Sequence, residues 1–319
     1  MSIDPEVLFH AVESVFSFFI IGVVGYYLAK NGWFSNESTA LITRLVTFVS
    51  LPVYLLYNIN TFMTKDQLLG MVYGLIVPFA SIIMMLGLAF ATTRLFHVPH
   101  NRRGLFYNSF AFSNTIYIGL PVNLALFGET ALPYVLLYYF ANTSLFWSFG
   151  NYCLATDGET VKAKLISIGT IKKIISPPMF GFGIGLVLLL MNIRLPRLLA
   201  NTANYLGGMT TPLVIMSLGI MIYDMGLKKI RFSGELGLIL IARFVISPVL
   251  ILLLVHFFPL PDLMRKVFII QSSLPVVSSM ALLAKFYGAD YDTATIIVSA
   301  TTLLALVTVP LYMLVGTYF

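Results

Sequence analysis

Two apolar stretches of the chain contain polar residues whose types suit the binding of a small ion. The first stretch holds Ser113, Asn114 and Thr115, and the second, about half a chain later, begins at Gln271. A side-chain amide offers two donors and an acceptor, and a hydroxyl offers one donor and two lone pairs. None of these groups carries a charge or exchanges protons near neutral pH. They therefore predict recognition of a ligand, with no catalytic step.

Glycine and proline accompany these polar residues and predict that both stretches break a helix. Gly119 and Pro121 follow the first group, and Pro275 lies inside the second. Proline removes one backbone donor and frees the carbonyl about one turn earlier. Freed backbone groups persist at membrane depth only where they line a cavity or pack inside protein. Paired broken helices in corresponding halves of a chain indicate a transporter's binding site.

The composition is that of an integral membrane protein. Hydrophobic residues make up 59% of the 319, and charged residues only 10%. The mean hydropathy is +0.92, a value that soluble domains do not approach. The single cysteine, Cys153, excludes a disulfide framework, and the histidines are too scattered for a metal cluster. We expect no cleaved signal peptide, because the first ten residues carry Asp4 and Glu6 but no Lys or Arg.

The apolar pattern predicts an all-α integral membrane fold of ten transmembrane helices joined by short loops. A membrane helix needs about 20 apolar residues, so this length leaves no room for a sizeable soluble domain. We expect the spans at 7–29, 37–60, 68–94, 104–127, 131–155, 174–191, 200–223, 233–258, 264–286 and 291–317.

The distribution of Lys and Arg predicts the orientation in the membrane. With both termini outside the cytoplasm, the inner loops hold twelve of these residues and the outer side five, as the positive-inside rule requires. The net charge of +6 then reflects the orientation in the membrane, with basic side chains beside the lipid head groups. We expect a multi-pass cell-membrane protein whose partners include the lipid bilayer but no nucleic acid.

An internal repeat relates the two halves of the chain. Pro52 pairs with Pro212, Pro78 with Pro248, Ser113 with Pro275, and Gly128 with Gly288, at offsets of 160, 170, 162 and 160. Prolines alone could align by chance, but the shared order of four landmarks argues against it. Five helices per half is an odd number, so the halves must insert with opposite orientation. The sequence therefore predicts a 5+5 inverted repeat with broken fourth and ninth helices.

Several of these residues together resemble the auxin efflux carrier family, which includes plant PIN carriers and bacterial malate or malonate permeases. The resemblance is carried by Leu51-Pro52, Asn114-Thr115 with Gly119-Leu-Pro121, Arg243 with Pro248, and Leu274-Pro275 leading into Ala284-Lys-Phe-Tyr-Gly288. It spans essentially the whole chain. Plant members usually have proline immediately before the asparagine, where this chain has Ser113. The long central loop of the plant carriers is also absent, so the chain is similar to prokaryotic, inner-membrane members.

The resemblance implies a fold shared with bile-acid symporters and sodium/proton antiporters. A scaffold would comprise residues 1–62 and 174–228, and a moving transport domain residues 63–156 and 229–319, with a cytoplasmic loop at 157–173. The broken helices four and nine would cross inside the transport domain. The resemblance also implies a homodimer formed through the scaffold.

The candidate ligands of the substrate lie at or near the breaks. We expect Asn114 to bind a carboxylate, although its amide could instead close the broken backbone turn. The substrate-binding candidates are Ser113, Asn114, Thr115, Asn142, Gln271, Pro275, Val276, Ser278 and Asn58. Half-helix N-termini favour anions, whereas Gly119, Pro121 and Pro275 are expected to shape the breaks. Serine hydroxyls can equally join membrane helices by hydrogen bonds.

No cofactor is expected, but a coupling ion remains open. Uncharged oxygens at Gln271, Ser272 and Ser273 could hold Na⁺. No Asp or Glu lies near the expected breaks, and Asp292 sits at the end of a span. Proton exchange at the crossing is therefore disfavoured, and H⁺ coupling elsewhere in the chain is the alternative to Na⁺. A potential that is negative inside favours export of a monoanion.

The sequence thus predicts a secondary transporter of a small organic anion, auxin-like or a mono- or dicarboxylate, that works by alternating access. Its expected activity is efflux driven by the membrane potential. The alternatives are a Na⁺-coupled carboxylate symporter, or a channel or ligand sensor on the same fold. An enzyme is disfavoured because no nucleophile, base and metal ligands cluster at depth. Arg243, a charge inside a span, is expected to pair with a partner or a helix C-terminus in a structural role.

Overall fold

The computed structural model describes residues 20–158, 176–225 and 232–316. Regular secondary structure in these residues is helical, with one isolated β-bridge between Ser113 and Val276. The fold class predicted from the sequence, an all-α protein, is confirmed at this level.

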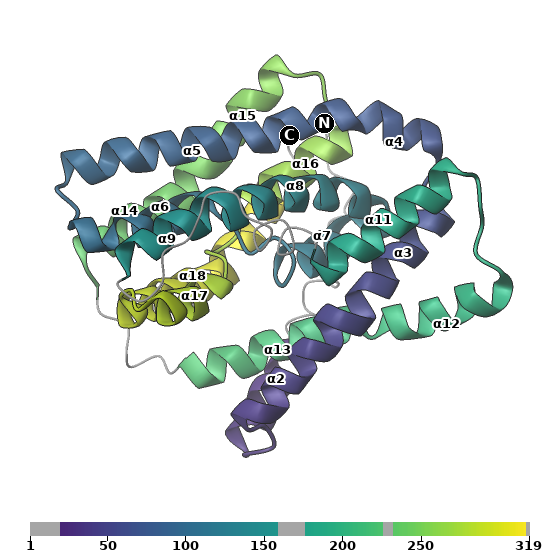
Figure 1. The fold of residues 1–319 in the computed structure, drawn as a ribbon, viewed down its shortest axis with the longest axis horizontal. Helices are drawn as coiled ribbons and strands as arrows, with labels where there is room; N and C mark the ends of the chain where they lie inside the picture. The colour runs from purple at the N-terminus through teal and green to yellow at the C-terminus, as the bar shows by residue number, and fades with distance from the viewer. Residues whose placement is uncertain (1–19, 159–175, 226–231, 317–319) are drawn as a thin grey trace. The chain divides into compact units, whose positions relative to one another are not determined.

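The helices in the first half of the described chain, drawn in Figure 1, lie close to the spans expected from the sequence. A first helix is described over Ile20–Lys30. It is followed by α2 (Asn36–Leu45), α3 (Leu51–Phe62), α4 (Lys65–Met71), α5 (Ile76–Leu95), α6 (Arg103–Ala111), α7 (Gly119–Phe127), α8 (Leu132–Leu145) and α9 (Asn151–Asp157). Short π-helical turns, Val46–Ser50 and Phe146–Gly150, join α2 to α3 and α8 to α9.

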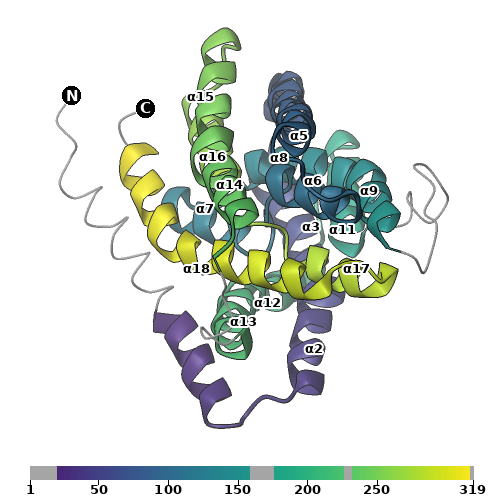
Figure 2. The same cartoon turned by 90° about the vertical axis from the view of Figure 1, so that its left-hand side faces the viewer.

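The second half has the same character. Its helices are α11 (Pro177–Leu190), α12 (Arg197–Gly208), α13 (Thr210–Met225), α14 (Gly234–Ile241), α15 (Ser247–Phe257), α16 (Asp262–Ser272), α17 (Ser279–Tyr287) and α18 (Tyr291–Gly316). A π-helical turn at Ala242–Ile246 joins α14 to α15. Figure 2 shows α17 and α18 side by side, and the two helices are in contact.

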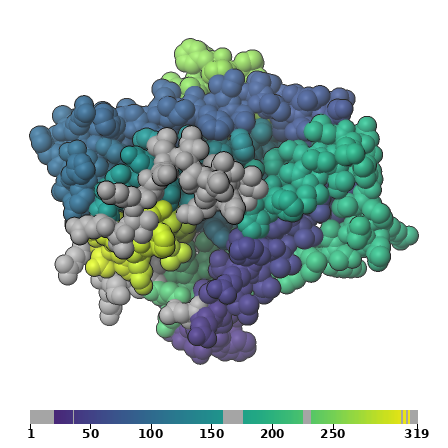
Figure 3. Space-filling view, viewed as in Figure 1, coloured from purple at the N-terminus to yellow at the C-terminus, as the bar shows by residue number. Residues whose placement is uncertain are grey.

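Four continuous helices in the described chain are long and apolar enough to cross a membrane, namely Glu37–Phe62, Lys65–Leu95, Arg197–Asp224 and Gly234–Phe257. Ile20–Lys30 and Pro177–Leu190 are shorter apolar helices. Large apolar side chains are exposed along α5, among them Ile76, Ile83 and Phe90, and the blue surface of this helix runs across Figure 3. Such a surface suits lipid rather than water.

The chain divides into two compact units. Unit 1 comprises Met1–Val72, Ile116–Pro133 and Ile175–Gly226, and unit 2 comprises Tyr73–Thr115, Tyr134–Ile174 and Leu227–Phe319. In unit 1, α11 packs closely on α3: a Cβ at Gly181 would lie 2.2 Å from the carbonyl oxygen of Pro52. In unit 2, α6 packs against α9, where a Cβ at Gly104 would lie 2.0 Å from the carbonyl oxygen of Cys153. Glycine is therefore required at both contacts.

Two interruptions, both inside apolar segments, separate α6 from α7 and α16 from α17. The first leaves residues 112–118 outside helix, and the second leaves residues 273–278. The sequence places the breaks at 113–116 and 274–277, so their existence is predicted and each is longer than expected. Residues 112–115 and 273–278 all belong to unit 2, and we call these two segments together the crossing.

Candidate binding site at the helix breaks

The two segments of the crossing pair with each other as short extended strands. The backbone N–H of Asn114 donates to the carbonyl of Pro275 at 2.9 Å, and that of Val277 donates to the carbonyl of Phe112 at 3.3 Å. These bonds flank the antiparallel bridge between Ser113 and Val276. The backbone groups that the breaks release from helix are thus paired inside protein, as membrane depth requires.

Asn142, on α8, completes the hydrogen bonding of Ser113. The N–H of Ser113 donates to Oδ1 of Asn142 at 3.0 Å, and Nδ2 of Asn142 donates to the carbonyl of Ser113 at 3.1 Å. The side-chain amide imitates a neighbouring β-strand. Asn142 is 3% exposed, so in this conformation its amide supports the break instead of facing an open space.

Arg243 is the buried cation of the crossing, with 0% exposure. It lies in the π-helical turn between α14 and α15, close before Pro248. Because Pro248 cannot donate to the carbonyl of Phe244 one turn earlier, that carbonyl instead accepts from the Tyr312 hydroxyl. The guanidinium donates, over 2.5–3.4 Å, to the Ser113 hydroxyl and to the carbonyls of Phe110, Ala111, Ser272 and Leu274.

Asn114 reaches across the crossing to the start of α17. Its Nδ2 donates to the hydroxyl of Ser278 at 2.7 Å, and the residue is 2% exposed. Ser278 is the N-cap residue of α17, but its side chain does not cap that helix. The first backbone N–H groups of a helix have no partner inside the helix. The start of α17 therefore combines a positive dipole end with an amide and a hydroxyl.

Gln271 links the last turn of α16 to the other segment. Its Nε2 donates to the carbonyl of Thr115 at 3.3 Å, whereas its Oε1 is buried without a hydrogen-bond partner. The hydroxyls of Ser272 and Ser273 donate to the carbonyls of Ile269 and Ile270 in their own helix. An unpaired buried acceptor is costly, so Gln271 is the member of this group with spare capacity for a ligand.

Sequence reasoning missed the partner of Val276. The N–H of Val276 donates to Oγ1 of Thr301 on α18 at 3.3 Å, and Thr301 is fully buried. A polar residue in the middle of a membrane helix was a signal that could have found it. Thr301 is one of several hydroxyl residues on α18, however, and nothing local distinguishes it from Thr302.

Three sequence candidates lie in unit 1. Asn58, on α3, donates to the carbonyl of Tyr54 in its own helix at 2.9 Å. Gly119 and Pro121 form the first turn of α7, where proline is tolerated because that N–H has no intrahelical acceptor. The residues that the structure brings together in unit 2 are Ser113, Asn114, Thr115, Asn142, Gln271, Pro275, Val276 and Ser278.

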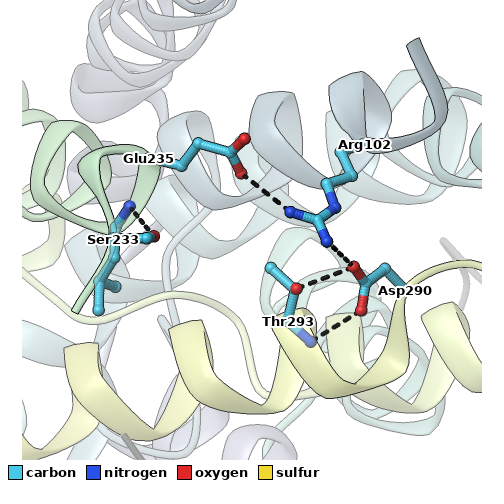
Figure 4. A network of polar contacts seen from close by, with 6 residues as sticks. Arg102, Ser233, Glu235, Asp290 and Thr293 are labelled. Carbon is cyan, nitrogen blue, oxygen red and sulfur yellow. Dashed lines mark hydrogen bonds and ion pairs between the residues drawn. The ribbon is translucent and has the colours of Figure 1, made fainter. Parts of the chain in front are cut away.

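A network of charged groups lies at the other end of unit 2. Arg102 contacts Asp290 at 2.8 Å and Glu235 at 3.8 Å, and Thr293 donates to both oxygens of Asp290 (Figure 4). Glu235 lies in the first turn of α14, so it is a carboxylate at the end of an expected span, like Asp292. Burial raises the pKa of Asp290, but the bonds from Thr293 and the Arg102 charge bring it below its ordinary value.

Asp157 caps α6, the half helix that leads into the first break. Its two carboxylate oxygens accept from the N–H groups of Gly104 and Leu105 at 2.8 and 2.6 Å. Burial raises the pKa of this carboxyl to about 6, although both N–H bonds and the nearby His100 lower it. A carboxylate at a helix N-terminus also complements the dipole.

The described part of the chain thus has apolar helices of membrane-spanning length and a buried crossing built from uncharged polar groups and one arginine. Among the residues that the structure describes, no three His, Cys, Asp or Glu side chains gather as a metal site would need. These features define a multi-pass membrane protein of the transporter class.

Comparison with known families agrees. Residues 10–313 match the family described as "Membrane transport protein", and the chain belongs to this family. It is the auxin efflux carrier and malonate permease type of family, so the resemblance inferred from the motifs is confirmed, and the chain falls among transporters rather than enzymes.

Related proteins extend over most of the chain. It is 23% identical over 302 residues to "Uncharacterized transporter MJ1031" of Methanocaldococcus jannaschii, covering 92% of this chain and 94% of that protein. It is 25% identical over 317 residues to an "Uncharacterized transporter" of Methanothermobacter thermautotrophicus, covering 96% and 98%. It is also 26% identical over 202 residues to a "Putative malonate transporter" of Rhizobium meliloti, covering 62% of each chain.

Proposed function

We propose that the chain is a secondary transporter that moves a small organic anion, an auxin-like monocarboxylate or a dicarboxylate, by alternating access. The observation that carries the proposal is the contact of Asn114 with Ser278 at the uncapped start of α17. Uncharged donors beside a positive helix end suit a carboxylate. The relative named as a malonate transporter supports the same substrate class.

In this proposal the carboxylate accepts hydrogen bonds from Asn114, Thr115 and the first N–H groups of α17. The substrate takes the place of Ser278 as the acceptor of Asn114, so the amide exchanges one partner for another. The hydrogen bonds between Ser113 and Asn142 keep the chain extended at Ser113. Gln271 binds the carbonyl of Thr115, next to Asn114. Pro275 and Val276 supply the paired backbone.

The proposed architecture is the ten-helix, 5+5 inverted repeat with broken, crossing helices four and nine. Scaffold segments 1–62 and 174–228 would form a homodimer, and segments 63–156 and 229–319 would move. Both termini would lie outside the cytoplasm, and the membrane would be a prokaryotic inner membrane. The proposal draws on the matched landmarks of the two halves and on the distribution of Lys and Arg.

The membrane potential is the proposed driving force for efflux. Moving one charge across 100 mV is worth about 2.3 kcal/mol, enough for an approximately 50-fold gradient. No carboxylate belongs to the crossing as defined by residues 112–115 and 273–278. A proton carried by Asp or Glu at the site is therefore not part of the proposal.

A Na⁺-coupled carboxylate symporter is the second candidate, and the unpaired Oε1 of Gln271 favours it. An uncharged oxygen that lacks a donor can coordinate Na⁺, with lone pairs of Ser272 and Ser273 close by in sequence. This candidate requires uptake that depends on a Na⁺ gradient, whereas the first candidate does not.

The test is uptake of labelled malonate, malate and auxin into proteoliposomes that contain the purified chain. We expect saturable uptake of one of these anions, counterflow, and acceleration by a potential that is positive on the side to which the anion moves. Acceleration by a Na⁺ gradient instead supports the symporter. Flux without saturation or counterflow supports a channel, and binding without flux supports a sensor. Absence of both binding and flux for all three anions contradicts the proposed substrate class.

A further inference from the structure

Arg243 carries a full positive charge at the crossing, and its charge is balanced by helix ends. In the described part of the chain it has no ion pair with a carboxylate. An unpaired charge in a protein interior is costly, so its retention needs a compensating group. The guanidinium's acceptors are backbone carbonyls and one hydroxyl.

The acceptors of Arg243 cluster at two helix C-termini. Phe110 and Ala111 are the last two residues of α6, and Ser272 is the last residue of α16. The final carbonyls of a helix have no partner inside it, and each C-terminus carries about half a negative charge. Two such ends together amount to about one negative charge, which matches the single charge of Arg243.

The opposite polarity, at the positive start of α17, has no side-chain cap, although the Met280 N–H donates to the carbonyl of Val277 at 3.2 Å. Ser278 does not cap this helix, and its hydroxyl accepts from Asn114 instead. Arg243 bonds Ser113, the residue immediately before Asn114, with an Nη2–Oγ distance of 2.5 Å. The cation is therefore one residue removed from the proposed ligands, and its donors all face protein.

We propose that Arg243 sets the charge of the binding site: it neutralises the C-terminal ends of α6 and α16, so that the positive end of α17 selects an anion. This inference rests on the proposed function. Arg243 is a positioning residue that acts through the helix ends, not a ligand of the substrate. Without its charge, two negative helix ends would oppose the carboxylate.

Two substitutions separate charge from hydrogen bonding. Arg243→Lys keeps the charge but loses the planar fork, whereas Arg243→Gln keeps a donor and loses the charge. We expect Arg243→Gln to weaken binding of the anion by about tenfold or more relative to Arg243→Lys. Arg102→Gln is the matched control, because Arg102 is paired with carboxylates at the other end of unit 2, and it should bind as the parent does.

A second pair of variants tests the charge without touching Arg243. Ser113→Asp places a carboxylate against the guanidinium and cancels its charge, and Ser113→Asn has the same size without a charge. We expect Ser113→Asp to bind the anion about tenfold or more weakly than Ser113→Asn. If the Arg243 variants do not fold, this pair still tests whether the charge of Arg243 affects binding of the anion.

Binding is measured by calorimetry in detergent with malonate, malate and auxin on protein whose thermal melt shows a folded state. If the parent binds none of them, the proposed function fails. If the parent binds one and Arg243→Gln matches Arg243→Lys, the role of Arg243 is only to bridge hydrogen bonds and the inference is wrong. Equal affinity of Ser113→Asp and Ser113→Asn overturns it as well.

Discussion

Asn114 makes two hydrogen bonds within the protein, and a ligand that binds it must replace one of them. Its backbone N–H is bound by Pro275 and its Nδ2 by Ser278. The backbone bond maintains the break, so only the side chain is available for exchange. A carboxylate that displaces Ser278 would exchange a neutral acceptor for an ionised one, which strengthens the hydrogen bond.

Substitution of Asn114 should therefore lower substrate affinity directly. Removing a hydrogen bond to an ionised group costs about 1.5–3 kcal/mol, so Asn114→Ala should bind the anion roughly 10- to 150-fold more weakly. Asn114→Asp should be worse, because it opposes the anion with a like charge. Calorimetry on folded protein measures both, with Asn192→Asp, at an exposed position, as the charge-matched control. Parent-like affinity of Asn114→Asp would assign the residue to backbone closure alone.

Asp157 should contribute to the free energy of unfolding at low pH and lose this contribution as pH rises. Burial raises its folded pKa to about 6, from an ordinary value of 3.8, and the residue lies two positions beyond the expected span 131–155. The folded state therefore binds more protons than the unfolded state between about pH 4 and pH 6. The contribution of this group to stability is complete below pH 4 and is lost as pH rises through 6.

The measurement is the melting temperature at pH 5 and at pH 7. We expect the parent to gain stability at pH 5 relative to Asp157→Asn, in which this titration is removed. Asp290→Asn is the comparison, because the pKa of Asp290 is lowered and its proton uptake begins below this window. An Asp157→Asn variant with the parent's pH dependence would assign the effect to other groups.

At the scale of the helices, the two breaks differ in how far residues within the break explain it. The second break contains Pro275, so a single residue explains the lost donor. The first has no proline before Asn114, and Phe112 to Asn114 stay extended because they pair with residues 275–277. Local residues therefore predicted the existence of both breaks, but not their lengths, and the first exceeds its expected length by more than the second does.

The contacts that hold the crossing are distant in sequence, which explains what sequence reasoning missed. Asn142 lies 29 residues from Ser113, and Arg243 lies 130 residues from it. Asn142 could be recognised as a costly amide in a membrane helix, but not as a substitute for a β-strand. Arg243 was expected to pair with a partner or with a helix C-terminus. Its contact with two helix C-termini follows only from the packing of α6, α16 and the turn after α14.

Asn142 should matter more to the stability of the break than its one side chain suggests. Asn142→Leu leaves the buried N–H and carbonyl of Ser113 without partners, at about 1–3 kcal/mol for each group. Asn151→Leu is the matched comparison: Asn151 is similarly buried and accepts one bond, from the Tyr287 hydroxyl. Thermal melts in detergent should therefore rank Asn142→Leu clearly below Asn151→Leu. The reverse order would mean that Ser113 finds other partners.

At the scale of the whole chain, the proposed inverted repeat predicts on which face of the membrane each loop lies. Gly128 and Gly288 occupy equivalent positions after the two broken helices, at an offset of 160. Because each half of the proposed repeat has five helices, equivalent positions would lie on opposite faces of the membrane. The distribution of Lys and Arg adds the direction, with Gly128 outside and Gly288 inside.

Cysteine labelling in intact cells tests that arrangement. Cys153 is the single cysteine and is buried; Cys153→Ala removes this background thiol and truncates only one small side chain. Thr130→Cys and Lys285→Cys then place one thiol beside each glycine, both at exposed positions. A membrane-impermeant maleimide should label Thr130→Cys from outside and Lys285→Cys only after the cells are opened. The opposite pattern would reverse the orientation, whereas labelling of both from outside would contradict the inverted repeat itself, because the two positions would then share one face.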